Sequence, residues 1–340
     1  MRMPWPVVGH ERAVDLLRRS LASGRTTQAY LIVGPPGVGK ATLAMLLAKA
    51  VNCEGEDRPC GRCPHCLRVE RGVHPDVLVI RRGMSFDEDE EGAGTRVGIG
   101  AIRQLIRDAS LLPMAGRYRV FIILDAETMT VEAANALLKT LEEPPPHVLV
   151  ILVAADDSVL PETVRSRCLR LELRPVGTAR VAALLQERGL GPELARLVAA
   201  LGRGRVGRSL TLAQDGEWLR WRQEFLDRQA GLLASGDAAG ALRWAQELAE
   251  AFGRDRDLVF EALDILAEWW RDVLLVKVGV PELITNRDRE AEIRRAADRL
   301  DIGQVTEAIR LLRRARRLLE QNAHPRLTLD NLVLGLPTLR

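Results

Sequence analysis

The segment Gly34-Pro-Pro-Gly-Val-Gly39-Lys40 limits the possible folds of this chain more than any other feature. Its spacing of Gly, four residues, Gly and Lys is that of the Walker A phosphate-binding loop. An apolar run over residues 29–33 precedes it, and a helical pattern over residues 40–51 follows it. A loop between a strand and a helix can wrap backbone N–H groups and the positive end of the helix dipole around a phosphate. This context favours a phosphate-binding loop over a glycine-rich helix start that has no ligand.

The rest of this domain is predicted from the apolar runs that follow the loop. Helical patterns lie over residues 99–111 and from the capping residue Thr130 to Leu141. Strands that alternate with helices predict an α/β fold with a parallel, doubly wound sheet. The further strands are expected at 77–80, 120–124, 148–153 and 169–173.

The composition changes after Pro175, because Ala, Leu, Arg and Glu then dominate in helical spacing and no strand-like run of note remains. We therefore expect three domains: an α/β domain over 1–175, a small helical lid over 176–212 and an all-α domain over 213–340. Four tryptophans of the last domain are expected in its core or in contacts with neighbouring chains, namely Trp218, Trp221, Trp269 and Trp270.

One ligand for Mg²⁺ is missing from the phosphate-binding loop. The residue after Lys40 should carry a Ser or Thr hydroxyl, but it is Ala41. Thr42 cannot simply replace that hydroxyl, because one step along a helix turns the side chain by about 100°.

A second departure follows the strand at 120–124. Asp125 resembles the Walker B aspartate that holds Mg²⁺, but the next residue is Ala126 where a glutamate should activate water. Glu127 lies one position too far and is expected to point elsewhere. These losses weaken hydrolysis more than binding, because the phosphate contacts are mainly backbone. The candidate residues for binding ATP or ADP are Gly34, Gly37, Val38, Gly39, Lys40, Thr42 and Asp125.

Four of the five cysteines lie within residues 53–66, as Cys53, Cys60, Cys63 and Cys66. Four thiolates spaced C-x6-C-x2-C-x2-C suit tetrahedral Zn²⁺, and they leave no open position for catalysis, so the zinc is expected to be structural. A redox or free-thiol role and an iron–sulfur cluster are the alternatives. For the nearby His65 and His74 we expect only a surface position.

Composition excludes several classes of protein. A formal net charge of +3 is too small to indicate a free-standing nucleic-acid-binding domain. No stretch approaches 18 uncharged apolar residues, and the first residues have no apolar core of a signal peptide. We therefore expect a cytoplasmic protein without a membrane span, in which stable disulfides are not expected.

The order of these motifs resembles that of the AAA+ subunits of the bacterial DNA polymerase III clamp loader. The resemblance is specific over residues 5–175 and moderate over 176–212. It implies an AAA+ P-loop domain with a zinc-binding insert, then a helical lid and a collar domain that joins five subunits. It is carried by the phosphate loop, by the four-cysteine insert directly after the loop helix, by Val7-Val8-Gly9, by Asp125, by Ala134-Asn135-Ala136-Leu137-Leu138-Lys139-Thr140-Leu141-Glu142-Glu143-Pro144-Pro145 and by Ser166-Arg167-Cys168.

Within this family the chain looks like the delta prime type, a stator that generally does not hydrolyse ATP. The ATP-hydrolysing gamma/tau type has Thr at 41, Glu at 126, a sensor Thr near 154–155 and a sensor Arg near 207. The resemblance therefore implies no independent ATPase activity. An active ATPase of the gamma/tau type is the alternative, and a DNA-binding zinc protein that uses the fold as a scaffold is a third hypothesis. At the four positions this chain has Ala41, Ala126, Ala154-Ala155 and Gly207.

The resemblance also implies that Arg167 is an arginine finger, which would reach the ATP site of the adjacent subunit. The alternative is a surface arginine paired with a carboxylate. The implied partners are the other clamp-loader subunits of gamma/tau and delta type, the sliding clamp and primed DNA, within a hetero-oligomer of the DNA polymerase III holoenzyme. Arg103 and Arg107, one helical turn apart, are candidates for phosphate contacts with that DNA.

Overall fold

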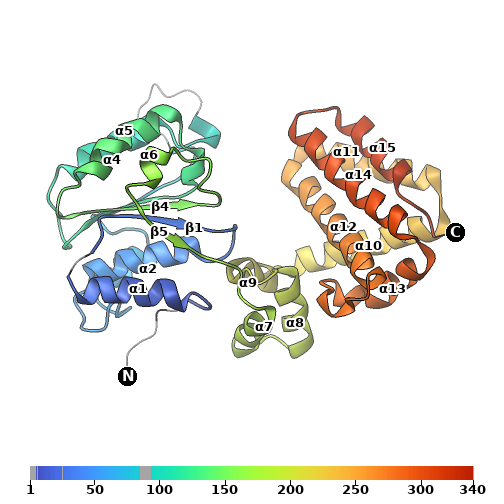
Figure 1. The fold of residues 1–340 in the computed structure, drawn as a ribbon, viewed down its shortest axis with the longest axis horizontal. Helices are drawn as coiled ribbons and strands as arrows, with labels where there is room; N and C mark the ends of the chain where they lie inside the picture. Colours follow the sequence, from blue (N-terminus) through green and yellow to red (C-terminus); the bar gives the residue numbers. More distant parts are fainter. Residues whose placement is uncertain (1–4, 6, 25, 85–92, 340) are drawn as a thin grey trace. The chain divides into compact units, whose positions relative to one another are not determined.

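The computed structural model describes residue 5 and residues 7–24, 26–84 and 93–339 (Figure 1). Its contacts divide the chain into two compact units. The first contains Met1–Val181 and Gly204–Arg208, and the second contains Ala182–Arg203 and Ser209–Arg340. The expected boundaries at residues 175 and 212 stay predictions.

A five-stranded sheet forms the centre of the first unit, and every strand pair in it is parallel. The strand order is β2-β3-β4-β1-β5. Nearly all residues of β1, β3 and β4 are buried, as expected for parallel strands that are covered on both faces. This confirms the predicted sheet. The strands are β1 (Ala29–Val33), β2 (Val77–Ile80), β3 (Arg119–Ile123), β4 (Val148–Ala154) and β5 (Leu169–Glu172).

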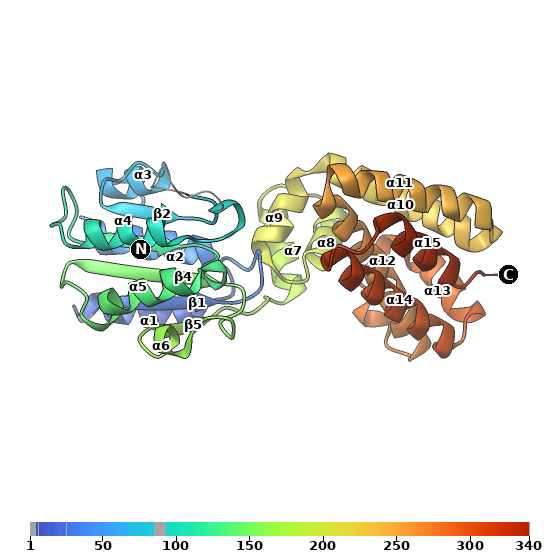
Figure 2. The same ribbon diagram turned by 90° about the horizontal axis from the view of Figure 1, so that it is seen from above.

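Helices cover both faces of this sheet (Figures 1 and 2). Alternate strand residues such as Tyr30 and Ile32 pack with α1 and α2, while Leu31 and Val33 belong to the core formed with α4, α5 and α6. The three predicted helices, α2, α4 and α5, begin and end close to the predicted positions, and Thr130 caps α5 by accepting the N–H of Ala133. Helices α1, α3 and α6 were not predicted. Their bounds are α1 (Glu11–Ala22), α2 (Lys40–Asn52), α3 (Pro64–Glu70), α4 (Ile99–Ala109), α5 (Val131–Glu142) and α6 (Glu162–Arg165), with 3₁₀ turns at Ala93–Thr95 and Ala126–Thr128.

The residues after the sheet are helical, as predicted. Short helices come first, namely α7 (Thr178–Glu187), α8 (Pro192–Leu201) and α9 (Val206–Gln214). The long helices of the second unit are α10 (Gly216–Ser235), α11 (Ala238–Arg254), α12 (Arg256–Lys277), α13 (Glu290–Arg299), α14 (Ile302–Glu320) and α15 (Pro325–Gly335), with 3₁₀ turns at Pro281–Leu283 and Arg287–Arg289.

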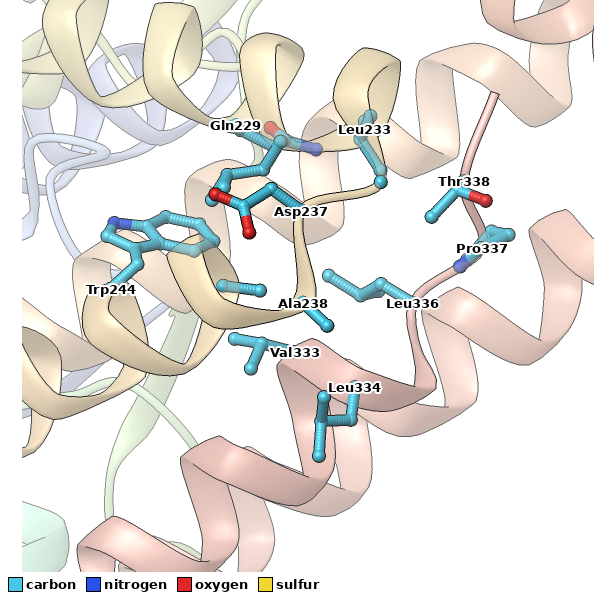
Figure 3. A pocket seen from close by; sticks show the side chains of 13 residues that line it. Gln229, Leu233, Asp237, Ala238, Trp244, Val333, Leu334, Leu336, Pro337 and Thr338 are labelled. Carbon is cyan, nitrogen blue, oxygen red and sulfur yellow. The ribbon is translucent and has the colours of Figure 1, made fainter. Parts of the chain in front are cut away.

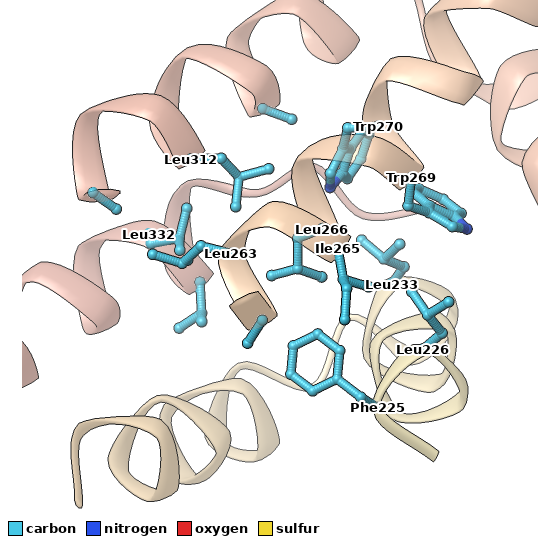
Figure 4. Close-up of a cluster of buried hydrophobic side chains, with 14 of the residues drawn as sticks. Phe225, Leu226, Leu233, Leu263, Ile265, Leu266, Trp269, Trp270, Leu312 and Leu332 are labelled. Carbon is cyan, nitrogen blue, oxygen red and sulfur yellow. The ribbon is translucent and has the colours of Figure 1, made fainter. Parts of the chain in front are cut away.

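Helix α12 contributes two adjacent tryptophans to the core of the second unit (Figure 4). Trp269 and Trp270 are buried there, with their rings in a T-shaped arrangement at 83° and 5.2 Å between centroids. Trp218 and Trp221 are partly buried against the same core. The expectation of core tryptophans is therefore confirmed for this unit. Among the described residues, no helix combines the length and the apolarity that crossing a membrane requires.

A buried arginine fixes the segment that joins α12 to α13. Arg222 of α10 is only 1% exposed, and its guanidinium donates to both carboxylate oxygens of Asp288, at 2.7 and 3.2 Å, and to Oδ1 of Asn286. Asp272 of α12 accepts from the backbone N–H groups of Thr285 and Asn286. Residues 285–288 are therefore held by polar contacts with two helices, α10 and α12.

A cavity of about 90 Å³ lies beside the buried amide of Gln229 in the second unit (Figure 3). Gln229 is 2% exposed, and neither atom of its amide has a hydrogen-bond partner among the described residues. A buried amide without a partner costs about 1–3 kcal/mol. The remaining walls are mostly apolar and include Trp244, Val333 and Leu336.

We expect Gln229→Leu to raise the free energy of unfolding by about 1 kcal/mol, because the variant removes that cost and keeps most of the volume. Urea denaturation followed by tryptophan fluorescence measures it, since five of the six tryptophans lie in this unit. The matched control is Gln246→Leu at an exposed position of α11, which should change stability by a few tenths of a kcal/mol at most. Loss of stability in Gln229→Leu would contradict the prediction.

Candidate functional site

The phosphate-binding loop lies between β1 and α2, as its spacing predicts. Gly34, Gly37 and Gly39 have φ angles of 152°, 76° and 111°, a backbone region that favours glycine. A side chain on Gly34 would also collide with the carbonyl oxygen of Leu173, only 2.2 Å from the Cβ position. The glycines of the motif are therefore required by the fold of the loop itself.

The ammonium group of Lys40 is directed back into this loop. Its Nζ donates to the carbonyl oxygens of Gly34 at 2.5 Å and Pro35 at 3.1 Å. Burial lowers the pKa of Lys40, although the nearby carboxylates of Glu127 and Asp125 act in the opposite direction. Lys40 therefore has two carbonyl oxygens of its own loop as hydrogen-bond partners.

The beginning of α9 lies directly against the same loop. The backbone N–H groups of Gly207 and Arg208 donate to the carbonyl oxygen of Gly37, at 2.8 and 3.3 Å. A Cβ at position 207 would lie 2.9 Å from that oxygen. Glycine at this position permits the close approach, and a side chain there would need the loop to move.

The other residues that were predicted to bind nucleotide make fewer contacts within the loop. The side chain of Val38 is buried in the core, and its N–H donates to the carbonyl of Pro35. Thr42 is exposed on α2, one position past Ala41. Asp125 is exposed at the end of β3, where it has a φ of 53° and lies 3.8 Å from the Arg82 guanidinium.

Glu127 contacts the backbone after β4, while its carboxylate stays near enough to Lys40 to act on the pKa of that lysine. Its Oε1 accepts the backbone N–H of Ala155 at 3.0 Å, directly after β4. It therefore occupies the end of β4, where the gamma/tau type would carry a sensor threonine. The sequence contains no signal for this contact, because the two residues are 28 positions apart.

The four cysteines of the insert come together. Their sulfur atoms all lie within 4.8 Å of one another, and those of Cys53 and Cys63 are 3.9 Å apart. Zn–S bonds of about 2.3 Å place tetrahedral sulfurs about 3.8 Å apart. The cluster, with Cys60 and Cys66 as its other members, could therefore hold a metal ion.

Backbone N–H groups point at these sulfurs. Gly55 and Cys60 donate to Sγ of Cys53 at 3.3 and 3.2 Å, and Cys63 donates to Sγ of Cys60 at 3.3 Å. Burial acts to raise the pKa of the Cys60 thiol, but the N–H groups of Arg62 and Cys63 outweigh it and lower that pKa to about 6. Burial prevails at Cys53 and Cys66, where it raises the thiol pKa although backbone N–H groups act in the opposite direction. Donors of this kind favour the thiolate form, which is the form that binds metal.

The expected surface position of His65 and His74 was wrong. Both are buried, and Nδ1 of His65 lies 2.8 Å from Nε2 of His74. Nε2 of His65 lies 3.1 Å from Glu54, and Nδ1 of His74 accepts the N–H of Asp76. The two rings therefore connect α3, which carries Cys66, to the residue that precedes β2.

Metal analysis of the purified chain should find one zinc per chain. Cys60→Ser with Cys63→Ser should abolish it, because two ligands are lost and hydroxyl groups do not replace thiolates at neutral pH. The measurement is elemental analysis after dialysis against metal-free buffer. Cys168→Ser is the matched control, since Cys168 lies outside the cluster and should leave the metal content unchanged. Wild-type protein without metal would contradict the zinc assignment.

Arg167 lies at the turn between α6 and β5, and its side chain contacts the end of α5. One guanidinium nitrogen lies 2.6 Å from Oε1 of Glu142, and another donates to the carbonyl of Thr163 at 2.8 Å. Both members of the ion pair are substantially exposed, so the pair contributes at most about 1 kcal/mol. A binding partner could therefore release Arg167 at little cost.

The family described as DNA polymerase III, delta subunit, matches residues 9–177 of this chain. The corresponding C-terminal family, DNA polymerase III, delta subunit, C terminal, matches residues 234–336. Together the two matches cover most of the sequence, on both sides of the helices α7 to α9.

Two relatives found by sequence agree with these matches. The delta prime subunit of DNA polymerase III from Bacillus subtilis is 29% identical over 96% of this chain and 95% of its own length. The tau subunit from Escherichia coli is 32% identical over 80% of this chain, which spans only 42% of that protein. A solved gamma subunit-related protein from Thermotoga maritima covers 95% of this chain at 18% identity, with a TM-score of 0.44. The chain therefore belongs to the DNA polymerase III delta-subunit family, in which it resembles the delta prime subunit over nearly its whole length.

Proposed function

We propose that this chain is a stator-like subunit of the DNA polymerase III clamp loader, which supplies Arg167 to the ATP site of a neighbouring subunit. In this proposal it assists the ATP-dependent loading of the sliding clamp onto primed DNA, in the cytoplasm. Its partners are loader subunits of gamma/tau and delta type, the clamp and the DNA. The four cysteines hold a structural zinc.

The position of Arg167 relative to the phosphate-binding loop carries this proposal. Tyr30 of β1 is paired in parallel with Leu169 of β5, so Arg167 is level with the beginning of β1. The loop starts at Gly34, after the end of that strand. Six residues at about 3.3 Å each separate the two ends by about 20 Å. Arg167 is therefore too far away to reach the loop of its own chain, which supports a role at the site of another chain.

The state of the chain's own loop supports the same assignment. Gly207 has no side chain that could contact a phosphate, and Glu127 accepts a hydrogen bond from the backbone N–H of Ala155. With Ala41 and Ala126 in place of a hydroxyl and a carboxylate, the site lacks one ligand of Mg²⁺ and the group that activates water. ATP or ADP binding without turnover is the role that remains for it.

ATP hydrolysis by the purified chain tests this proposal. We expect no turnover by the chain alone, with or without Lys40→Ala, because the hydrolytic groups are absent. Turnover should arise when the other loader subunits, the clamp and primed DNA are added, and it should depend on Arg167. Turnover by the chain alone that is abolished by Lys40→Ala would instead establish an active ATPase of the gamma/tau type.

A further inference from the structure

A groove of about 500 Å³ lies between α14 and α15 in the second unit. Its lining is largely apolar, because α14 contributes Leu311, Ala315 and Leu318 and α15 contributes Leu327 and Leu332. The side chain of Leu327 is 62% exposed. Clefts that bind ligands in proteins measure about 300–1,000 Å³. The groove is therefore large enough to take up several apolar side chains of a ligand.

The two helices that form the groove run in opposite directions. A Cβ on Gly335, the last residue of α15, would lie 2.8 Å from Cδ1 of Leu311 in α14. Because both helices rise about 1.5 Å per residue, Asn331 is then level with residues 314 and 315 of the other helix. Arg314 and Asn331, which both line the groove, therefore lie at the same level on its two walls.

Three hydrogen-bond donors of the groove are available to a ligand. The side chains of Arg314 and Asn331 make no hydrogen bond or ion pair within the part of the chain that the structure describes. His324 accepts the N–H of Leu327 with Nδ1, at 3.5 Å, so the proton of its neutral ring is on Nε2. Donors of this kind are complementary to carboxylate oxygens.

The charges of α14 and α15 do not balance. Residues 302–335 contain six arginines and three acidic residues. Each acidic residue pairs with an arginine of its own helix, in the pairs Glu307–Arg310, Glu320–Arg316 and Asp330–Arg326. The other three arginines are exposed and have no carboxylate within ion-pair distance among the described residues, namely Arg313, Arg314 and Arg317. The excess positive charge of the two helices therefore belongs to α14 alone.

Two of these arginines border the groove. Arg314 lines it directly. Arg317 is three residues further along α14, which turns its side chain by only about 60° from that of Arg314. It also precedes Leu318, another lining residue. One rim of the apolar groove is therefore basic.

This combination indicates the chemistry of the ligand. Electrostatic complementarity requires negative charge at the rim, and the lining requires apolar side chains between the helices. Nucleic acid fits less well, because its bases stack on aromatic rings and the described lining contains no Phe, Tyr or Trp. From Leu311 to Leu318 the groove measures about 10 Å along α14, which equals two turns of a helix or three residues of an extended chain.

We propose that the groove between α14 and α15 binds an acidic peptide segment of a partner protein. Apolar side chains of that segment enter the groove, and its carboxylates pair with Arg314 and Arg317. The proposal goes beyond the proposed function, because it concerns neither the phosphate-binding loop, nor Arg167, nor the cysteine cluster. It is also independent of that function, since binding requires no ATP.

Fluorescence anisotropy of a labelled peptide of glutamate and leucine, titrated with the full chain, tests the groove. We expect saturable binding that weakens as salt is added, because the rim charges are exposed. Arg314→Glu with Arg317→Glu should weaken it at least tenfold. The matched control is Arg294→Glu with Arg295→Glu, which makes the same change of charge at exposed positions of α13 and should bind as wild type.

The apolar contribution is tested separately. Leu327→Ser should weaken binding of the peptide at least fivefold. Leu283→Ser is the matched control, since Leu283 is 56% exposed in the same unit but outside the groove, and it should bind as wild type. All these variants change exposed residues, so each should unfold at the same urea concentration as wild type.

Two further probes separate the peptide from other ligands. A peptide with serine in place of leucine and a single-stranded DNA oligonucleotide should each bind at least tenfold more weakly. Equal binding of the serine peptide would show attraction of charge without use of the groove, and would overturn the proposal. Tighter binding of the oligonucleotide would overturn it in favour of nucleic acid. No binding of the leucine peptide to wild type would also overturn it.

Photo-crosslinking locates the bound peptide. A diazirine analogue of leucine in the peptide should attach to residues 311–332, and attachment mainly elsewhere would contradict the assignment. The experiment is repeated after the other loader subunits are added, where the peptide should still bind. Loss of binding in that assembly would mean that another subunit covers the groove, and would overturn its use by a separate peptide segment.

Discussion

Arg167→Ala is expected to slow ATP turnover about 10³-fold or more at the one site of the reconstituted clamp loader that receives this arginine. The guanidinium would stabilise the charge that spreads over the γ-phosphoryl oxygens during transfer, and a methyl group cannot do so. Release of Arg167 from Glu142 is cheap, because that pair is exposed. The loss should therefore reflect the missing charge at the neighbouring site.

Single-turnover hydrolysis with clamp and primed DNA is the suitable measurement, since the other sites of the loader keep their own residues and would hide the loss at steady state. Arg167→Lys should recover only part of the rate, because an ammonium has no planar fork of donors. Arg170→Ala is the matched control on the neighbouring strand, where the arginine pairs with Asp157. If a loader that contains Arg167→Ala hydrolysed ATP at the wild-type rate at every site, the arginine-finger role would be contradicted.

Arg222→Met is expected to lower the free energy of unfolding by about 3–5 kcal/mol. The side chain is fully buried, and the substitution leaves the carboxylate of Asp288 and the amide of Asn286 without their donor. Domains are stable by only about 5–15 kcal/mol, so this is a large part of the total. Urea denaturation followed by tryptophan fluorescence measures the change.

The matched control is Arg228→Met on the same helix. Arg228 pairs with Glu247 at an exposed position, and such pairs contribute about 0–1 kcal/mol. Combining Arg222→Met with Asp288→Asn should recover part of the loss, because the remaining unpaired charge is removed. A change below about 1 kcal/mol in Arg222→Met would show that the segment before α13 does not depend on this arginine.

Local sequence patterns were sufficient to predict most strands and helices of the first unit. The strand at 29–33 and the cap at Thr130 were predicted within a residue, because buried apolar runs and capping side chains act over a few positions. The strand predicted from 120 begins one residue earlier, at Arg119. Arg119 is buried, and its guanidinium donates to the carbonyls of Asp108 and Leu112. A charged residue is normally expected at the surface, so its residue type gave no indication that it belongs to the strand.

Contacts between distant positions were not predictable in the same way. His65 and His74 were expected at the surface, because histidine occurs both at protein surfaces and in cores. In the structure both rings are buried and hydrogen-bonded. Asp76 reaches residues 38 to 40 positions away, and Asn52 reaches residues 65 and 66 positions away. One sequence gives no indication of which distant amide an aspartate or asparagine will meet.

The sequence by itself determined the parallel sheet, the glycine-rich loop, the cysteine cluster and the absence of hydrolytic groups at positions 41 and 126, since each depends on residue type at short spacing. Tertiary structure alone decided that Lys40 bonds its own loop, that α9 closes on Gly37, that Arg167 lies at the opposite end of the sheet from the loop, and that the Arg117 guanidinium bonds the carbonyl of Cys53. These features arise when strand register and chain topology bring together groups that are far apart in sequence, and their polar atoms then pair because burial removes water as a partner.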